Sequence, residues 1–179
     1  MINFPYYFFE DFLDESQIKY VNETYWNKRI KPDEEGTEWK NVNSWNIDTI
    51  TNCEVMNKIN WNVFLQNEKH FGYDLYPRGV SNGNLNYYTD DKNDYDWHQD
   101  ATPYNHKDDM KITFLVNIST KKYVGGKLQL FPGYLLETPE LDKPGNAIMF
   151  PSFTPHKVTP VIEGERISFS TWFSGPGFK

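Results

Sequence analysis

Disulfides and membrane spans are the first features that this sequence lacks. Cys53 is the only cysteine, so an intrachain disulfide is impossible. No stretch approaches the roughly 20 apolar residues that a transmembrane helix requires. The opening MINFPYYFFEDF also lacks the basic leader and apolar run of a signal peptide. We therefore expect a soluble protein of the reducing cytoplasm that has no membrane partner.

Internal repeats, low-complexity tracts and Pro/Gly/Ser-rich linkers are also absent. A chain of 179 residues can bury a sizeable core without disulfides or structural metals. The sequence therefore predicts one domain that spans residues 1–179.

Basic residues are too few for a general nucleic-acid binder. Lys and Arg number 18 against 25 Asp and Glu, which gives a net charge of -7. A chain of this charge repels phosphate backbones as a whole. We expect no nucleic-acid partner.

What the chain does contain is large rings in an otherwise polar sequence. Trp, Tyr and Phe make up 17% of the residues, while the mean hydropathy is -0.74. This composition is typical of a globular protein whose core is built from aromatic side chains.

The apolar pattern changes partway along the chain. Helical spacings of three and four predict helices over residues 14–29 and 49–67. From about residue 73 the pattern becomes short apolar or alternating runs between Gly and Pro turns, which is typical of antiparallel sheets in a sandwich or barrel. We therefore predict an α+β, mainly β fold, with residues 1–72 as a helical N-terminal support and residues 73–179 as the β core. The predicted strands lie in YDLYP, NLNYYT, YDWHQD, KITFLVNIS, KLQLFP, AIMFPS, HKVTPV and RISFSTWF.

Two residues of YDWHQD suggest a metal site. On an extended strand, His98 and Asp100 project to the same face and can bind one ion together. A second imidazole from a distant strand would complete the two-His, one-carboxylate triad that holds Fe(II) and leaves open positions. His156 is the best candidate, whereas His70 and His106 have no partner at ligand spacing and are predicted to be surface or hydrogen-bonded residues.

Arg166 is the candidate anion-binding residue. It lies ten residues after His156 and shares a strand face with Ser168. A guanidinium is a permanent, bidentate partner for a carboxylate, and its burial among rings is costly unless an anion meets it. The alternative is an ion pair with Glu163 or Glu165.

Three motifs in this order resemble one enzyme family. NYYTDDKNDYDWHQD, VGGKLQLFP and PGNAIMFPSFTPHKVTPVIEGERISFSTWF resemble segments of the prolyl 4-hydroxylase-like, PKHD-type branch of the 2-oxoglutarate/Fe(II) oxygenases. The resemblance covers about residues 84–173, half of the chain. It implies a double-stranded β-helix, or jelly roll, of two antiparallel sheets with helices packed on one side.

The resemblance also assigns roles to residues. It implies that His98, Asp100 and His156 are the catalytic iron ligands. Arg166 matches the residue that binds the C5 carboxylate of 2-oxoglutarate. The remaining matches to the co-substrate site are Ser168 and Tyr88, which would add hydrogen bonds, and Leu128 and Trp172, which would line the pocket.

The match to the family is incomplete at two positions. Many animal members carry a second pocket Tyr on the strand after the metal motif, where this chain offers Val116. Many prolyl 4-hydroxylases have Lys at the distal basic position, so Arg166 points to the Arg-bearing subgroup. The first difference leaves the hydrogen bonds to 2-oxoglutarate open.

The function that the resemblance implies is hydroxylation of a C–H bond. The expected substrate is a prolyl residue in a protein or peptide, with O2 consumed, succinate and CO2 released, and ascorbate as the reductant. A free amino acid or another small molecule is the alternative substrate. A nucleic-acid demethylase is a rival, but that branch carries a second Arg where Trp172 stands. Outside the oxygenases, the alternatives are a cupin-like metal protein, for which an H-x-H pair is missing, and a non-catalytic binding domain.

Overall fold

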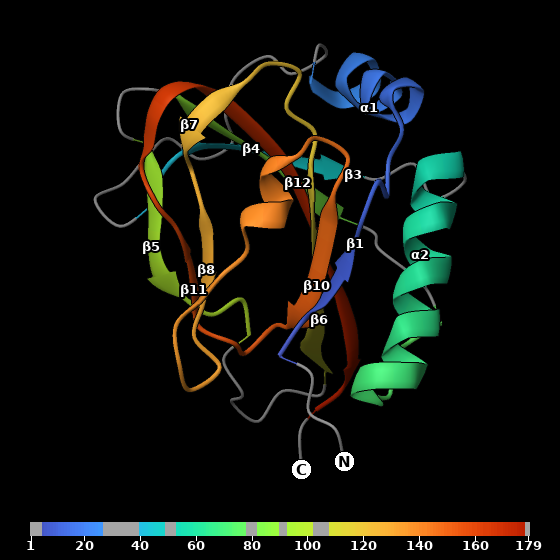
Figure 1. Ribbon diagram of the computed structural model, residues 1–179. Coiled ribbons are helices and arrows are strands. Elements are labelled where there is room, and N and C mark those ends of the chain that lie inside the picture. The colour runs from blue at the N-terminus through green and yellow to red at the C-terminus, as the bar shows by residue number, and fades with distance from the viewer. Residues whose placement is uncertain are drawn as a thin grey trace.

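Two antiparallel sheets form the body of the protein, and helices cover one of them (Figure 1). The computed structural model describes residues 5–26, 40–48, 53–77, 82–89, 93–101 and 108–177. Within them, α1 and α2 lie on the side of the larger sheet, away from β5, β8 and β11 (Figure 1). The predicted class, mainly β with helices packed on one side, is confirmed.

The larger sheet joins strands from both ends of the chain. Its described strands all pair antiparallel, and β12 lies between β6 and β4. The order across the sheet is β1 (Tyr7–Phe9), β10 (Ala147–Pro151), β6 (Asp108–Asn117), β12 (Val161–Pro176), β4 (Asn82–Thr89) and β3 (Asn43–Asp48), and β7 (Tyr123–Gly125) pairs with β12.

The smaller sheet faces the first and carries short strands. Its order is β2 (Lys40–Asn41), β5 (Asp94–His98), β11 (His156–Val158), β8 (Leu128–Leu130) and β9 (Leu136–Glu137). The first 72 residues, which the sequence predicts to be a helical support, therefore also supply β1, β2 and β3. A 3-10 turn, η3 (Pro139–Asp142), follows β9.

Period-two alternation divides the core into two parts. On β6, Phe114 and Val116 pack in the cluster beneath the helices, whereas Leu115 packs in the cluster between the two sheets. The same alternation on β12 sends Phe169 to the helical side and leaves Arg166 and Ser168 between the sheets. The space between the sheets is therefore where polar side chains are enclosed.

The helices begin at capped residues. Asp14 forms a capping box at the start of α1 (Glu15–Val21), and the Sγ of Cys53 accepts from Met56 N at the start of α2 (Glu54–Gln66). Each helix continues into one π-helical turn, η1 (Asn22–Trp26) or η2 (Asn67–Phe71). Both predicted helices are confirmed within the described residues, although residues 27–29 and 49–52 lie outside them. None of the described helices is long and apolar enough to cross a membrane.

One predicted strand is wrong. Residues 73–77, YDLYP, run without strand pairing. The Asn67 side chain accepts from Tyr73 N at 3.1 Å and donates to Tyr73 O at 2.8 Å. These side-chain bonds satisfy the backbone groups of Tyr73, and the segment makes one backbone bond to β12, from Tyr76 N to Ser174 O at 2.9 Å. Alternation of apolar residues therefore does not produce a strand here.

Phe114 joins the sheet to the helical side of the core. Its ring contacts Phe9 and Phe12 at centroid distances of 5.8 and 5.2 Å, and its side chain is fully buried. Phe114→Ala should lower the free energy of unfolding by about 3–5 kcal/mol, because a buried ring leaves a cavity. Urea denaturation measures this loss. Trp61→Ala, at a position 72% exposed on α2, is the control and should change stability by less than about 1 kcal/mol.

Candidate active site

Three potential metal ligands meet at one end of the space between the sheets. β5 and β11 are neighbouring strands (Figure 1). They pair antiparallel, and their register places His98 directly opposite His156. The ring centroids are 4.1 Å apart. One ligand atom from each of His98, Asp100 and His156 lies within 4.8 Å of the others. The sequence therefore predicted a set of residues that the fold brings together.

The position of Asp100 does not come from a strand that it shares with His98, as the spacing of two residues predicts. β5 ends at His98, so the strand pleat does not place the carboxylate. Instead the backbone N–H of Asp100 donates to the Ser152 carbonyl at 3.0 Å, and Thr113 Oγ1 donates to Asp100 Oδ2 at 2.7 Å. Thr113 also bonds Ser152 Oγ at 3.0 Å. Two buried residues thus orient the carboxylate: Thr113 of β6 and Ser152 of the segment after β10.

Both imidazoles are held in the same orientation. His98 Nδ1 lies 2.7 Å from the Asp96 carbonyl, and His156 Nδ1 lies 2.9 Å from the Thr154 carbonyl. A carbonyl oxygen only accepts, so each Nδ1 donates its proton and each Nε2 presents a lone pair. The Nε2 atoms face the Asp100 carboxylate at 3.8 and 3.6 Å.

This donor set fits Fe(II). Two neutral imidazole nitrogens and one carboxylate oxygen, from one face, are the ligands of the non-haem iron triad and leave coordination positions open. Rings support the ligands: Tyr95 stacks on His98 at 3.6 Å, and Phe150 contacts His156 edge-on at 4.9 Å. Among the described residues the only thiol is Cys53, which caps α2, so thiolate ligation has no candidate at this site.

Arg166 is buried between the two sheets. Its side chain is 1% exposed, and Nη1 donates to Ser168 Oγ at 3.1 Å. Within the described part of the chain, no carboxylate lies within ion-pair distance of this guanidinium. Of the two alternative partners, Glu163 is exposed, and Glu165 instead bonds Lys121 at 3.3 Å and the Tyr87 hydroxyl at 2.9 Å. A desolvated cation of this kind favours an anionic ligand.

Tyr88 lies beside this cation. The Arg166 guanidinium carbon is 5.0 Å from the centre of the Tyr88 ring. Burial raises the pKa of Tyr88 to about 12, although the neighbouring guanidinium acts in the opposite direction. The phenol therefore stays protonated at neutral pH and can donate a hydrogen bond to an anion.

A cavity between the sheets connects these groups. Tyr88, Leu128 and Trp172 line it together with the three ligand candidates, so these predicted positions face one space. Arg166 and Ser168 are buried next to Tyr88 rather than in the immediate lining. The Nε1 of Trp172 is a buried donor that finds no hydrogen-bond partner in the part of the chain that the structure describes.

One sequence-based assignment is wrong. Val116 does not face the cavity, because it packs in the core cluster beneath the helices. Its neighbour Leu115 lines the cavity, since adjacent strand residues point to opposite faces. The sequence alone does not determine the register of β6, so it does not show which of these two residues faces the cavity.

Several lining residues were not predicted at all. Ser170 could have been found, because it continues the face of β12 that carries Arg166, Ser168 and Trp172. The other missed residues carry no such signal and are placed by strand pairing; they are Asn84, Asn86, Tyr95, Thr113, Leu115 and Val158.

Comparison with known proteins agrees with this geometry. The family model of the 2OG-Fe(II) oxygenase superfamily matches residues 83–174, just over half of the chain. A PKHD-type hydroxylase of Alteromonas mediterranea is 38% identical over 85 residues, which are 44% of this chain and 37% of that protein. The match thus spans a little over a third of the relative's length.

Solved structures share the fold. The viral collagen prolyl hydroxylase of Paramecium bursaria Chlorella virus-1, in complex with 2OG, has a TM-score of 0.75 at 18% identity, covering 96% of this chain and 97% of that one. The prolyl hydroxylase of Trichoplax adhaerens, in complex with a hypoxia inducible factor peptide fragment, has a TM-score of 0.68 at 17% identity, covering 94% and 83%. At these identities the likeness shows the fold alone.

Two facing sheets with two imidazoles and a carboxylate at one end define the jelly-roll, metal-dependent oxygenases. The chain belongs to the 2OG-Fe(II) oxygenase superfamily, and it is an oxygenase enzyme. The predicted jelly roll and the PKHD-type resemblance are confirmed. The family implies Fe(II), 2-oxoglutarate and O2 as cofactor and co-substrates.

The bond from Thr113 to Asp100 predicts a loss of metal affinity on substitution. Thr113→Val keeps the shape but removes the hydroxyl, so the carboxylate loses its fixed orientation. The dissociation constant for Fe(II), or for Co(II) followed by its visible absorption, should rise about 10- to 100-fold. Thr113→Ser should restore most of the affinity, and unchanged metal binding in the valine variant would contradict this role.

Proposed function

We propose that this enzyme is an Fe(II)- and 2-oxoglutarate-dependent hydroxylase of a prolyl residue in a protein or peptide. One oxygen atom of O2 enters the substrate C–H bond as hydroxyl, and the other enters succinate as 2-oxoglutarate loses CO2. Bound Fe(II) supplies the activation of oxygen, which no side chain can provide. Ascorbate is the reductant that we expect to keep the metal ferrous.

The observation that carries the proposal is a buried guanidinium beyond a metal-ligand cluster. Arg166 has no described carboxylate partner, and it lies beside Tyr88, which lines the same cavity as His98, Asp100 and His156. A dicarboxylate co-substrate fits both features, because one carboxylate can pair with the guanidinium while the other end binds the metal.

Each part of this chain would then have a defined task. His98, Asp100 and His156 hold the metal, with the two imidazoles kept in one tautomer by backbone carbonyls. Arg166 binds the distal carboxylate, and the protonated Tyr88 phenol adds a hydrogen bond. Apolar side chains such as Leu128 exclude water from the cavity.

The prolyl substrate is supported by relatives rather than by the site. Two of the similar folds are prolyl hydroxylases, and one of them is in complex with a peptide. Fold alone does not fix the substrate, so a free amino acid or small molecule remains the alternative. Trp172 stands where a nucleic-acid demethylase carries a second Arg, which disfavours a nucleic-acid substrate.

We also propose a cytoplasmic location. The support is that the single cysteine, Cys53, is buried and free. A reducing compartment suits such a thiol.

Removing the cation should weaken co-substrate binding. Arg166→Ala should raise the dissociation constant for 2-oxoglutarate at least about 30-fold, because loss of a buried charge-assisted contact costs about 2–5 kcal/mol. The dissociation constant of Arg166→Lys should lie between those of the wild type and Arg166→Ala, since Lys keeps the charge but not the bidentate fork. Calorimetric titration of the metal-loaded protein measures both constants.

Lys122→Ala, at an exposed position, is the charge-matched control and should bind like the wild type. Equal 2-oxoglutarate affinity in folded Arg166→Ala and wild-type protein would rule out this guanidinium as the carboxylate partner.

Turnover tests the metal assignment and the substrate together. Succinate formation with Fe(II), ascorbate and 2-oxoglutarate should rise on adding proline-containing peptides and should disappear in His98→Ala, which removes one metal ligand. Mass spectrometry should show one added oxygen on proline. If succinate formation rises only with free amino acids, the substrate is a free amino acid rather than a prolyl residue in a peptide.

A further inference from the structure

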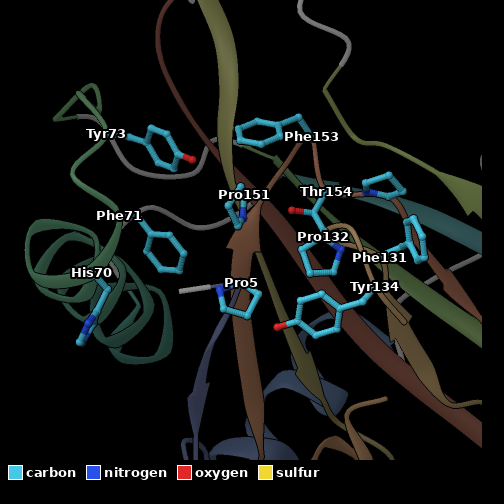
Figure 2. A pocket seen from close by; sticks show the side chains of 11 residues that line it. Pro5, His70, Phe71, Tyr73, Phe131, Pro132, Tyr134, Pro151, Phe153 and Thr154 are labelled. Carbon is cyan, nitrogen blue, oxygen red and sulfur yellow. The ribbon is translucent and has the colours of Figure 1, made fainter. Parts of the chain in front are cut away.

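A second cavity lies on the outer side of the segment that leads to His156. Its volume is about 460 Å³, within the range of about 300–1,000 Å³ typical of ligand pockets. Figure 2 shows Phe71 and Tyr73 on one side, Phe131 and Tyr134 on the other, and prolines between them. We call this cavity the aromatic pocket; its lining residues are Pro5, His70, Phe71, Tyr73, Phe131, Pro132, Tyr134, Pro151, Phe153, Thr154 and Pro155.

The lining indicates the chemistry of its ligand. Among the described residues it contains five Phe or Tyr rings, four prolines and the His70 imidazole, but no Lys, Arg, Asp or Glu. An anionic or cationic ligand would therefore lose its hydration without gaining a charged partner. Rings and prolines offer flat apolar surfaces, which suit uncharged extended peptide that carries proline or aromatic residues. Burial raises the pKa of Tyr73, so its hydroxyl stays neutral as well.

The wall of the pocket also positions the metal ligands. The Thr154 carbonyl accepts from His156 Nδ1 at 2.9 Å, and Gln99, which lies between His98 and Asp100, donates to the Phe153 carbonyl. A ligand in the pocket would thus rest against the same segment that holds the catalytic imidazole.

Exposed rings extend the pocket toward the metal strand. Phe131 is 46% exposed and Tyr134 is 57% exposed. The ring of Trp97, next to His98 and itself 42% exposed, lies 6.2 Å from that of Phe131. Contiguous exposed rings on a chain of mean hydropathy -0.74 mark a binding surface rather than ordinary scatter.

We propose that the aromatic pocket binds an uncharged, proline- or ring-containing segment of the peptide substrate, next in sequence to the residue that is hydroxylated. Two observations favour this occupant: the described lining residues include no Lys, Arg, Asp or Glu to match a charged partner, and Phe153 and Thr154, which line the pocket, lie in the segment that leads directly to His156. The inference rests on the peptide substrate of the proposed function. It makes the enzyme selective for extended peptides over short ones.

Peptides of two lengths distinguish binding in the aromatic pocket from binding at the metal site alone. The test uses the holoenzyme with Fe(II) and 2-oxoglutarate but without O2, titrated in a calorimeter with blocked alternating Ala-Pro peptides of ten and three residues. In the wild type the decapeptide should bind more tightly than the tripeptide. The double variant Phe131→Ser, Tyr134→Ser should weaken decapeptide binding about tenfold or more and leave tripeptide binding unchanged, because contact rings of this kind dominate binding.

Two controls separate contact from damage. Trp61→Ser changes an exposed ring on α2 and should leave both affinities unchanged. Peptide-independent turnover of 2-oxoglutarate by the double variant should equal that of the wild type, because neither residue touches the metal-ligand cluster.

The outcomes distinguish this inference from the proposed function. If the decapeptide binds through Phe131 and Tyr134 but no peptide is hydroxylated when O2 is admitted, the prolyl function fails and the pocket stands. If peptides are hydroxylated but the double variant binds the decapeptide like the wild type, the pocket inference is overturned. It is overturned equally if light scattering shows that the variant abolishes a dimer, because the rings would then belong to an interface between copies.

Discussion

The antiparallel pairing of β5 with β11 is the constraint on which the site depends. It places His98 opposite His156, although 57 residues separate them in the chain, and it sets their rings 4.1 Å apart. A shift of one residue in this register would turn one imidazole to the other face of the sheet. The ladder hydrogen bonds and the apolar residues between the sheets therefore fix the geometry of a polar site.

Polar contacts then refine what the register allows. Backbone carbonyls select one tautomer for each histidine, and Thr113 orients the carboxylate of Asp100. The Ser152 carbonyl accepts from the Asp100 backbone N–H, and the Ser152 hydroxyl bonds Thr113. The segment between β10 and His156 therefore takes part in the site. The same segment forms a wall of the aromatic pocket, which joins ligand geometry to a substrate surface.

Burial gives the surroundings of Arg166 their chemical character. Arg166 is enclosed with Ser168 and Tyr88, away from bulk water, where a cation is costly unless an anion meets it. Gly126 is part of this arrangement, because its φ is +61° and a Cβ there would lie only 2.8 Å from Arg166 Cδ. The turn before β8 thus closes directly over the guanidinium stem.

The sequence by itself determined the residue types of the site and the broad fold. His98, Asp100 and His156 could be recognised because few side chains bind Fe(II), and the change from helical to alternating apolar spacing separated helices from strands. Only the tertiary structure decided which side of a strand an apolar residue faces, because apolar side chains such as Val116 and Leu115 carry no chemical signal for the site. It also placed Asp100 beyond the end of its strand and gave residues 73–77 no strand conformation. The physical reason is that register and backbone hydrogen-bond partners come from segments distant in the chain, which local periodicity does not encode.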